Sequence, residues 1–153
     1  MGLEVEKRLE EKGISYRLIE LEGRAVSVKD VLALAKEKIK LEEVCKTIVA
    51  KDGKGNSYAF VLKGNQKIDM AKAERLVGGG LRIARPEEVE DAAGVEPGAV
   101  CPLLLEIPIL VDRRVLDTER INFGSGDHLY GVEISTKDLE KVIEFRVADF
   151  AKV

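Results

Sequence analysis

Lys46 is the charged residue whose place in the sequence most favours chemistry. It begins the segment 46–49 (KTIV), which is typical of a buried strand. A lysine held at the start of such a strand could bind a phosphate or stabilise negative charge in a transition state. The alternative is an ordinary solvent-exposed lysine, which is the usual state of this residue type.

Two glycine-containing segments are candidates for binding through the backbone. In the segment from Gly98 to Pro102 (GAVCP), the glycine allows close backbone approach and the proline fixes the turn, so N–H groups could point at a ligand carbonyl. The segment Gly124-Ser125-Gly126 follows a predicted strand and could form an anion or oxyanion nest. An ordinary turn is the alternative in both cases.

Three further side chains could take part in chemistry. Cys101 could be a nucleophile, but no base partner is evident near it, and a buried unreactive thiol is more common. Asp112 ends an apolar strand, where side chains often enter a pocket, or it forms a salt bridge with the arginines that follow it. His128 is the one histidine, and we favour a surface histidine or one with a satisfied ring.

The composition limits the class of protein. A length of 153 residues with 45% hydrophobic and 35% charged residues predicts one globular domain over 1–153. Two Cys and one His provide three ligands where structural zinc needs four, so we expect no metal and no cofactor. No apolar run approaches the roughly 18–20 residues of a membrane span and no signal segment is evident, which predicts a cytoplasmic protein without membrane contact.

The charge is unevenly distributed along the chain. The net charge of -3 divides into -1 over residues 1–45, +6 over residues 46–85 and -8 over residues 86–153. A basic block inside an acidic protein is compatible with an anionic ligand that meets one face. The alternative is a set of solvated lysines. The near absence of aromatic residues, at 5% with no Trp, argues against a large base-stacking surface.

The elements that must position these residues alternate between helices and strands. Hydrophobic spacing and capping residues predict an α+β domain with a curved, mixed, mostly antiparallel and barrel-like sheet flanked by helices. The predicted helices are 3–12, 27–39, 69–78, 86–94 and 135–143. The predicted strands are 15–21, 46–51, 57–63, 81–84, 109–112, 120–123, 129–134 and 146–148. The second helix is expected to bury one face formed by Val28, Val31, Leu32, Ala35 and Ile39.

The order of these motifs resembles one known family. The helix before KTIV, the hairpin, the segment 84–89 (ARPEEV), the G-x-x-x-P loop, ILVD at 109–112 and GSG at 124–126 follow one another as in the YbaK/prolyl-tRNA synthetase-associated editing domain. The resemblance runs from about residue 15 to the C-terminus. It implies that family's fold and removal of wrongly attached amino acids from tRNA.

The resemblance also implies roles for individual residues. Lys46 matches the lysine most needed for deacylation. The G-x-x-x-P loop, which positions the aminoacyl carbonyl, maps onto Gly98 and Pro102. Asp112, Gly124, Ser125 and Gly126 match residues that help to form the pocket. Cys101 and Asp127 stand where many relatives have other residues and border the expected pocket.

We therefore expect a trans-editing hydrolase in which water attacks the aminoacyl ester of a misacylated tRNA. By resemblance, Ala- and Cys-charged proline tRNA are the leading substrates, and serine and threonine-tRNA substrates stay open. The expected partners are the tRNA acceptor end and an aminoacyl-tRNA synthetase. The oligomeric state stays open. One alternative is a non-catalytic module that binds aminoacyl-tRNA or a synthetase, and a weaker one is a thiol enzyme that depends on Cys101.

Overall fold

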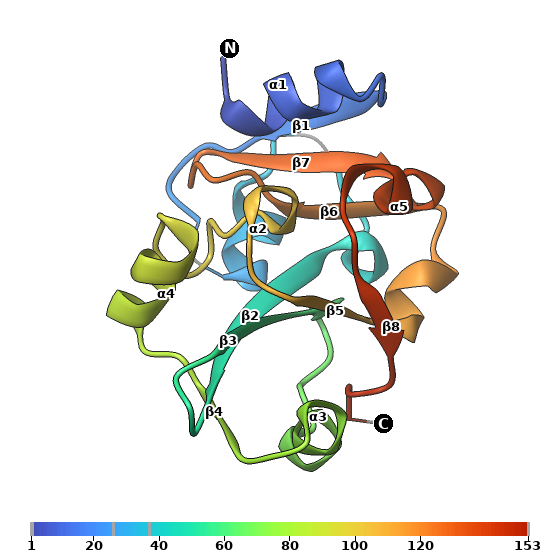
Figure 1. Ribbon diagram of the computed structural model, residues 1–153. Helices are drawn as coiled ribbons and strands as arrows, with labels where there is room; N and C mark the ends of the chain where they lie inside the picture. The colour runs from blue at the N-terminus through green and yellow to red at the C-terminus, as the bar shows by residue number, and fades with distance from the viewer. Residues whose placement is uncertain (1, 26, 37, 153) are drawn as a thin grey trace.

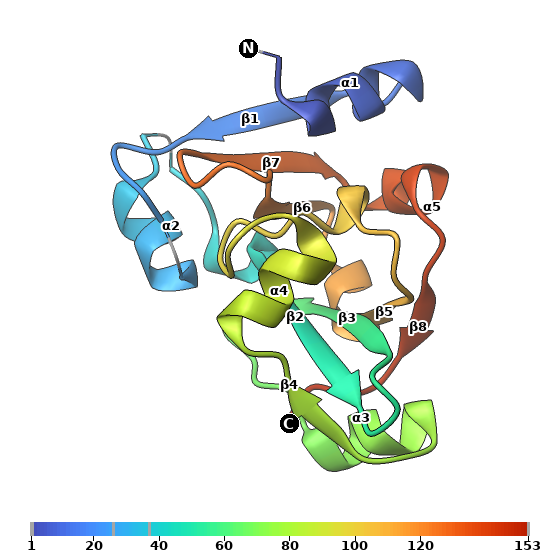
Figure 2. The ribbon, with the colours of Figure 1, turned by 60° about the vertical axis from the view of Figure 1, so that its left-hand side comes forward.

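Two β-sheets form the centre of the fold, and the helices lie around them (Figures 1 and 2). The computed structural model describes residues 2–25, 27–36 and 38–152. The α-helices are α1 (Glu4–Glu11), α2 (Val28–Leu34), α3 (Met70–Val77), α4 (Pro86–Ala93) and α5 (Leu139–Val142). The 3-10 helices are η1 (Leu41–Glu43), η2 (Pro102–Leu104), η3 (Arg113–Asp117) and η4 (Thr136–Asp138). The strands are β1 (Tyr16–Glu20), β2 (Cys45–Asp52), β3 (Ser57–Lys63), β4 (Leu81–Ile83), β5 (Ile109–Asp112), β6 (Arg120–Gly124), β7 (Tyr130–Ser135) and β8 (Arg146–Ala148).

The strands are divided between a three-stranded and a five-stranded sheet. The smaller sheet has the order β1-β7-β6 and is antiparallel throughout. The larger has the order β4-β2-β3-β5-β8, in which β5 pairs in parallel with both β3 and β8. The predicted mixed, mostly antiparallel α+β architecture is confirmed. The single barrel-like sheet is not, because β6 pairs with β7, and one isolated bridge between Val44 and Asn122 joins the two sheets.

The main apolar core lies between the sheets and extends to α1 and α5, with Leu9, Val61, Phe123 and Leu139 among its buried members. A second core lies between the larger sheet and α3. Its centre is a T-shaped contact between Phe60 and Phe150, with ring centroids 5.1 Å apart. In both ribbon views α1 and α3 lie at opposite ends of the molecule. Among the described residues, no helix is long and apolar enough to span a membrane.

Local chemistry explains several helix boundaries. The Ser27 hydroxyl accepts a hydrogen bond from the Asp30 N–H at 3.1 Å, and this cap starts α2 as the sequence predicts. Asp69 caps α3 in the same way. Gly78 and Gly94 end α3 and α4 with φ values of 80° and 76°, in the left-handed region that glycine adopts without steric cost.

Helix α2 is shorter than the predicted helix 27–39. It ends at Leu34 because Ala35 is extended and pairs with Leu21 in an isolated bridge. Leu32 is exposed, and none of the residues of α2 is fully buried. The predicted buried face is therefore wrong at Leu32, and α2 packs only partly against the small core beneath β1, through Val31 and Leu34.

Candidate functional site

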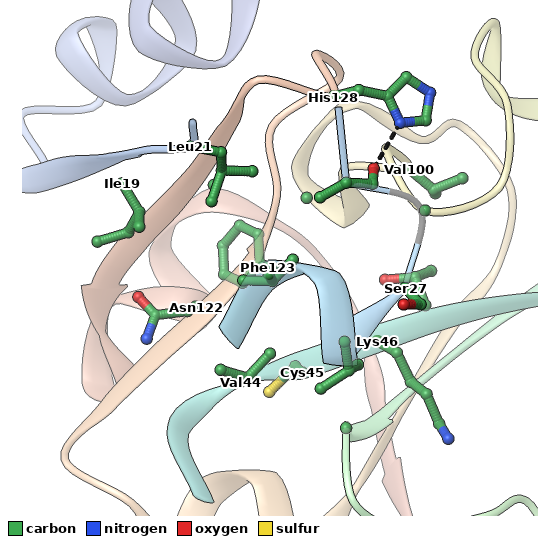
Figure 3. A pocket seen from close by; sticks show the side chains of 18 of the residues that line it. Ile19, Leu21, Ser27, Val44, Cys45, Lys46, Val100, Asn122, Phe123 and His128 are labelled. Carbon is green, nitrogen blue, oxygen red and sulfur yellow. Dashed lines mark hydrogen bonds between the residues drawn. The ribbon is translucent and has the colours of Figure 1, made fainter. Parts of the chain in front are cut away.

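A cavity of about 420 Å³ lies where the two sheets meet. Its walls come from β2, the end of β6, helix α2, and the two loops that carry Gly98 and Asp127. Three of the predicted site residues line it: Lys46, Gly98 and Gly124. Residues more than 75 positions apart in the sequence therefore surround one small space (Figure 3).

Lys46 enters this cavity from β2, where its backbone pairs with Leu62 of β3. The side chain is partly buried, and Figure 3 shows it extending away from Asn122 and Val44. Burial, followed by the nearby charge of Lys67, lowers the pKa of Lys46. Among the described residues Lys46 has no ion-pair partner, so its ammonium group is available to an anionic ligand.

The two glycine segments touch each other at the edge of the cavity. The Gly126 N–H donates to the Ala99 carbonyl at 2.8 Å, and a Cβ on Gly124 would lie 2.5 Å from the Val100 carbonyl oxygen. Gly98 and Gly126 have φ values of 95° and 93°, which other residues rarely adopt. The two segments, which the sequence analysis treated as separate candidates, therefore form one structural unit. Steric constraints favour glycine at positions 98, 124 and 126 of this glycine unit.

This unit presents free backbone donors. Within the described part of the chain, the N–H groups of Gly98 and Val100 have no hydrogen-bond acceptor, and both residues line the cavity. Val100 is buried, so its N–H has limited access to bulk water. Donors of this kind can stabilise an oxyanion that forms beside them.

His128, in the loop between β6 and β7, lines the cavity as well. Its Nδ1 lies 2.8 Å from the Ala25 carbonyl oxygen (dashed in Figure 3), and because a carbonyl only accepts, Nδ1 carries the hydrogen. Nε2 lies 3.8 Å from a Glu96 carboxylate oxygen. The prediction that the histidine ring is hydrogen-bonded is therefore confirmed for Nδ1. This hydrogen bond also joins Ala25, which precedes α2, to the loop that carries the glycine unit.

Three predicted site residues lie behind the cavity wall. Cys101 and Pro102 are buried beyond Val100, and Ser125 is buried with its hydroxyl donating to the Tyr130 carbonyl at 2.7 Å. Burial raises the pKa of Cys101 to about 12, so its thiol is protonated at neutral pH. Gly126 lines a shallower neighbouring depression with Glu96 and His128. These residues support the loops and do not form the surface of the cavity.

Asp112 does not line the cavity either. It is fully buried, and its carboxylate accepts N–H bonds from Phe150 and Ala151 at 2.9 Å and pairs with Arg114. Burial opposes its ionisation, but these hydrogen bonds outweigh burial and hold the pKa of Asp112 below its usual range. The predicted pocket role is corrected: this aspartate fastens the C-terminal segment to the end of β5, beside Asp149.

Several cavity residues were missed from the sequence. Helix α2 contributes Val28 and Val31, which the pattern assigned to a core face. Asn122 and Thr47 also line the cavity with buried polar atoms. Asn122 gave a signal that could have been used, because it is a polar residue between the apolar Ile121 and Phe123 of strand β6.

An α+β domain here places a half-buried lysine and two glycine loops around one small cavity, and groups of these kinds can interact with an ester or an anionic group. Residues 25–142 match the aminoacyl-tRNA editing domain, and the chain belongs to that family.

The chain is also similar to solved structures. The hypothetical protein APE2540 is 27% identical, with a TM-score of 0.88 over 97% of this chain and 99% of that one. A candidate trans-editing enzyme for prolyl tRNA synthetase is also 27% identical, with a TM-score of 0.82 over 97% of this chain and 95% of that one. A candidate signal transduction protein from Marinobacter aquaeolei VT8 shares the fold at 22% identity and a TM-score of 0.70, over 97% of this chain and 30% of that one.

Proposed function

We propose that this protein hydrolyses the ester bond of misacylated tRNA in trans, in the cytoplasm, and that it removes alanine or cysteine from proline tRNA. Its similarity to a candidate trans-editing enzyme for prolyl tRNA synthetase supports proline tRNA as the carrier. A cavity of about 420 Å³ suits a small aminoacyl group at the end of a ribose. A second site of this kind removes residues that a synthetase pocket fails to reject.

The observation that carries the proposal is that Lys46 and the free N–H groups of Gly98 and Val100 surround the same cavity. In the reaction, water attacks the ester carbonyl, with help from a ribose hydroxyl, and the two N–H groups stabilise the oxyanion. The bond between the carbonyl carbon and the ribose oxygen then breaks, and the ribose oxygen takes a proton. The products are the free amino acid and uncharged tRNA, and the reaction requires no protein nucleophile.

The positive charge of Lys46 binds the terminal phosphate or the negative charge that develops on the substrate. Lys29 lies at the same cavity, and Lys63 directly precedes Gly64 of its wall. These lysines provide an approach surface for the tRNA acceptor end. The charge of -8 over residues 86–153 limits nonspecific RNA binding, and a synthetase assists by supplying the mischarged tRNA.

The test is a deacylation assay on proline tRNA charged with alanine, cysteine, serine or proline. The wild type should release alanine or cysteine, and Lys46→Ala should reduce kcat/KM by about 100-fold or more. Lys54→Ala is the matched control, because Lys54 is exposed in the β2–β3 turn, and it should retain full activity. A wild type that hydrolyses none of these tRNAs contradicts the proposal, and binding without hydrolysis would identify the non-catalytic module.

The thiol mechanism makes a separate prediction. Cys101 is buried with a raised thiol pKa of about 12, so Cys101→Ala should leave hydrolysis within about two-fold of the wild type. Loss of activity in a folded Cys101→Ala variant would favour the thiol enzyme.

A further inference from the structure

Asn122 places an unsatisfied carboxamide in the wall of the cavity. The residue is 3% exposed, and neither its Nδ2 nor its Oδ1 has a hydrogen-bond partner within the described part of the chain. Buried polar groups are almost always paired, and an unpaired amide loses the hydrogen bonds that water would make. Such a group at a cavity wall is explained if a ligand completes it.

The fold does not use this side chain for its own structure. Glu133 is the register partner of Asn122 on β7, but its carboxylate is bound by Arg17 at 2.9 Å and lies 3.6 Å from Arg120. The isolated bridge between Asn122 and Val44 involves only backbone atoms. The carboxamide therefore has no partner within the described part of the chain, and its residue lines the cavity.

The surroundings of the carboxamide are apolar. In Figure 3 Asn122 lies on the side of Ile19 and Val44, and Lys46 extends the other way. All four residues line the cavity. If the tRNA end meets Lys46, the part of the aminoacyl group that lies farthest from the phosphate meets Asn122. Thr47 adds a second buried polar group without a partner, its hydroxyl, to the same cavity.

We propose that Asn122 is a specificity-determining residue whose carboxamide binds a hydroxyl or thiol on the side chain of the esterified amino acid. The inference rests on the proposed hydrolysis of misacylated tRNA and changes its expected order of substrates: serine and cysteine, which carry such a group on Cβ, are preferred to alanine. Serine is the better ligand because a hydroxyl both donates and accepts well, whereas a thiol does both weakly. A site that binds a substrate hydroxyl rejects the analogue lacking it, since its own polar group then stays unpaired.

The experiment compares Ser-, Cys- and Ala-charged proline tRNA with the wild type, Asn122→Leu and Asn122→Ala. The wild type should prefer serine to alanine by about 10-fold or more in kcat/KM. In Asn122→Leu, whose side chain has a similar volume, kcat/KM should fall by about 10-fold or more on Ser-charged tRNA and change by less than about three-fold on Ala-charged tRNA. Its melting temperature should be equal or higher, because an unpaired buried amide has been removed. Asn122→Ala provides the same comparison if the leucine variant does not fold, and Asn65→Leu at an exposed turn position is the control.

Two results would overturn the inference. An equal loss on all three substrates would mean that Asn122 binds a group common to every amino acid, such as the α-ammonium. A wild type that prefers alanine would mean that the carboxamide excludes polar side chains.

A binding experiment distinguishes failure of this inference from failure of the proposed function. If no tRNA is hydrolysed, the proposed function fails, and calorimetry with seryl and alanyl amides of 3′-amino-3′-deoxyadenosine still tests Asn122. Tighter binding of the seryl amide that Asn122→Leu abolishes supports the inference. Equal binding of the two amides overturns it.

Discussion

The Gly126 N–H donates a hydrogen bond to the Ala99 carbonyl oxygen over 2.8 Å. This bond joins the loop after β6 to the loop that leads into η2, and both loops border the cavity. The position of the free N–H groups of Gly98 and Val100 therefore depends on a segment some 25 residues away in the sequence. Changes in either loop should affect the same donors.

Gly124→Ala should damage the cavity from the β6 side. Its Cβ would lie 2.5 Å from the Val100 carbonyl oxygen and 3.0 Å from the Ala99 backbone, so the two loops must separate. Overpacking of this kind costs about 1–3 kcal/mol of stability, and the displaced donors should reduce kcat by about 100-fold. Thermal unfolding and deacylation rates measure both effects. Gly79→Ala, where a Cβ meets nothing within 4 Å, is the control, and equal behaviour of the two variants would contradict the steric explanation.

Lys67→Met should raise the pKa of Lys46. Burial and the charge of Lys67 both lower that pKa, and the substitution removes the second cause while leaving the first. With the charge of Lys67 gone, the ammonium group of Lys46 should persist to higher pH. NMR titration of ¹³C-methylated lysines follows Lys46 directly and avoids the alkaline lability of the ester. Lys54→Met should leave the titration unchanged, and an unshifted Lys46 in Lys67→Met would show that the two charges do not interact.

Asp112→Asn should destabilise the fold without altering the cavity. The carboxylate is buried and holds Phe150, Ala151 and Arg114, so loss of its charge should cost about 3 kcal/mol in the free energy of unfolding. The folded pKa of Asp112 is depressed, so its stabilisation is present above the unfolded value of about 3.9 and is lost as the pH falls through the folded value.

Denaturant unfolding at several pH values tests this prediction. The difference in the free energy of unfolding between wild type and variant should be largest at neutral pH and should shrink below about pH 4. The exposed Asp117→Asn is the control. A folded Asp112→Asn protein that has lost hydrolysis but kept its stability would restore Asp112 to the site.

Salt dependence should report the lysines that meet tRNA. Lys63→Gln and Lys67→Gln together should reduce the slope of log affinity against log salt by about 1 per lysine. Lys72 belongs to the same basic block, but it donates to Asp149 and to the Ala151 carbonyl, so it serves the C-terminal segment. Lys141→Gln on α5 is the control. An unchanged slope in the double variant would indicate that the basic block is only solvated surface.

Helix ends were predictable from the sequence because they depend on local atoms. Ser27, Asp69, Pro86 and Gly94 start or end helices through contacts within a few residues, and the structure confirms all four. The early end of α2 was not predictable, because it follows from the pairing of Ala35 with Leu21 across a loop. The separation into two sheets is likewise a matter of long-range pairing.

The residues of the candidate site likewise divide into those that the local sequence predicts and those that depend on long-range contacts. Lys46, Gly98 and Gly124 were predicted because their residue types restrict what each position can do. Asp112 was misplaced, since the sequence does not reveal that Phe150 and Ala151 return to the end of β5. The position of Asn122 between two apolar residues was a usable signal, but the unpaired state of its amide can be recognised only when all of its neighbours are known.

The bridge between Val44 and Asn122 has a consequence for how such a protein can evolve. The join between the sheets uses the backbone at position 122, so it does not depend on which side chain stands there. A substitution at this position can change which ligand the cavity prefers while the bridge between the two sheets stays intact. A duplicated copy of the chain could therefore acquire a new preference in one step, without first gaining stability to compensate for a weakened fold.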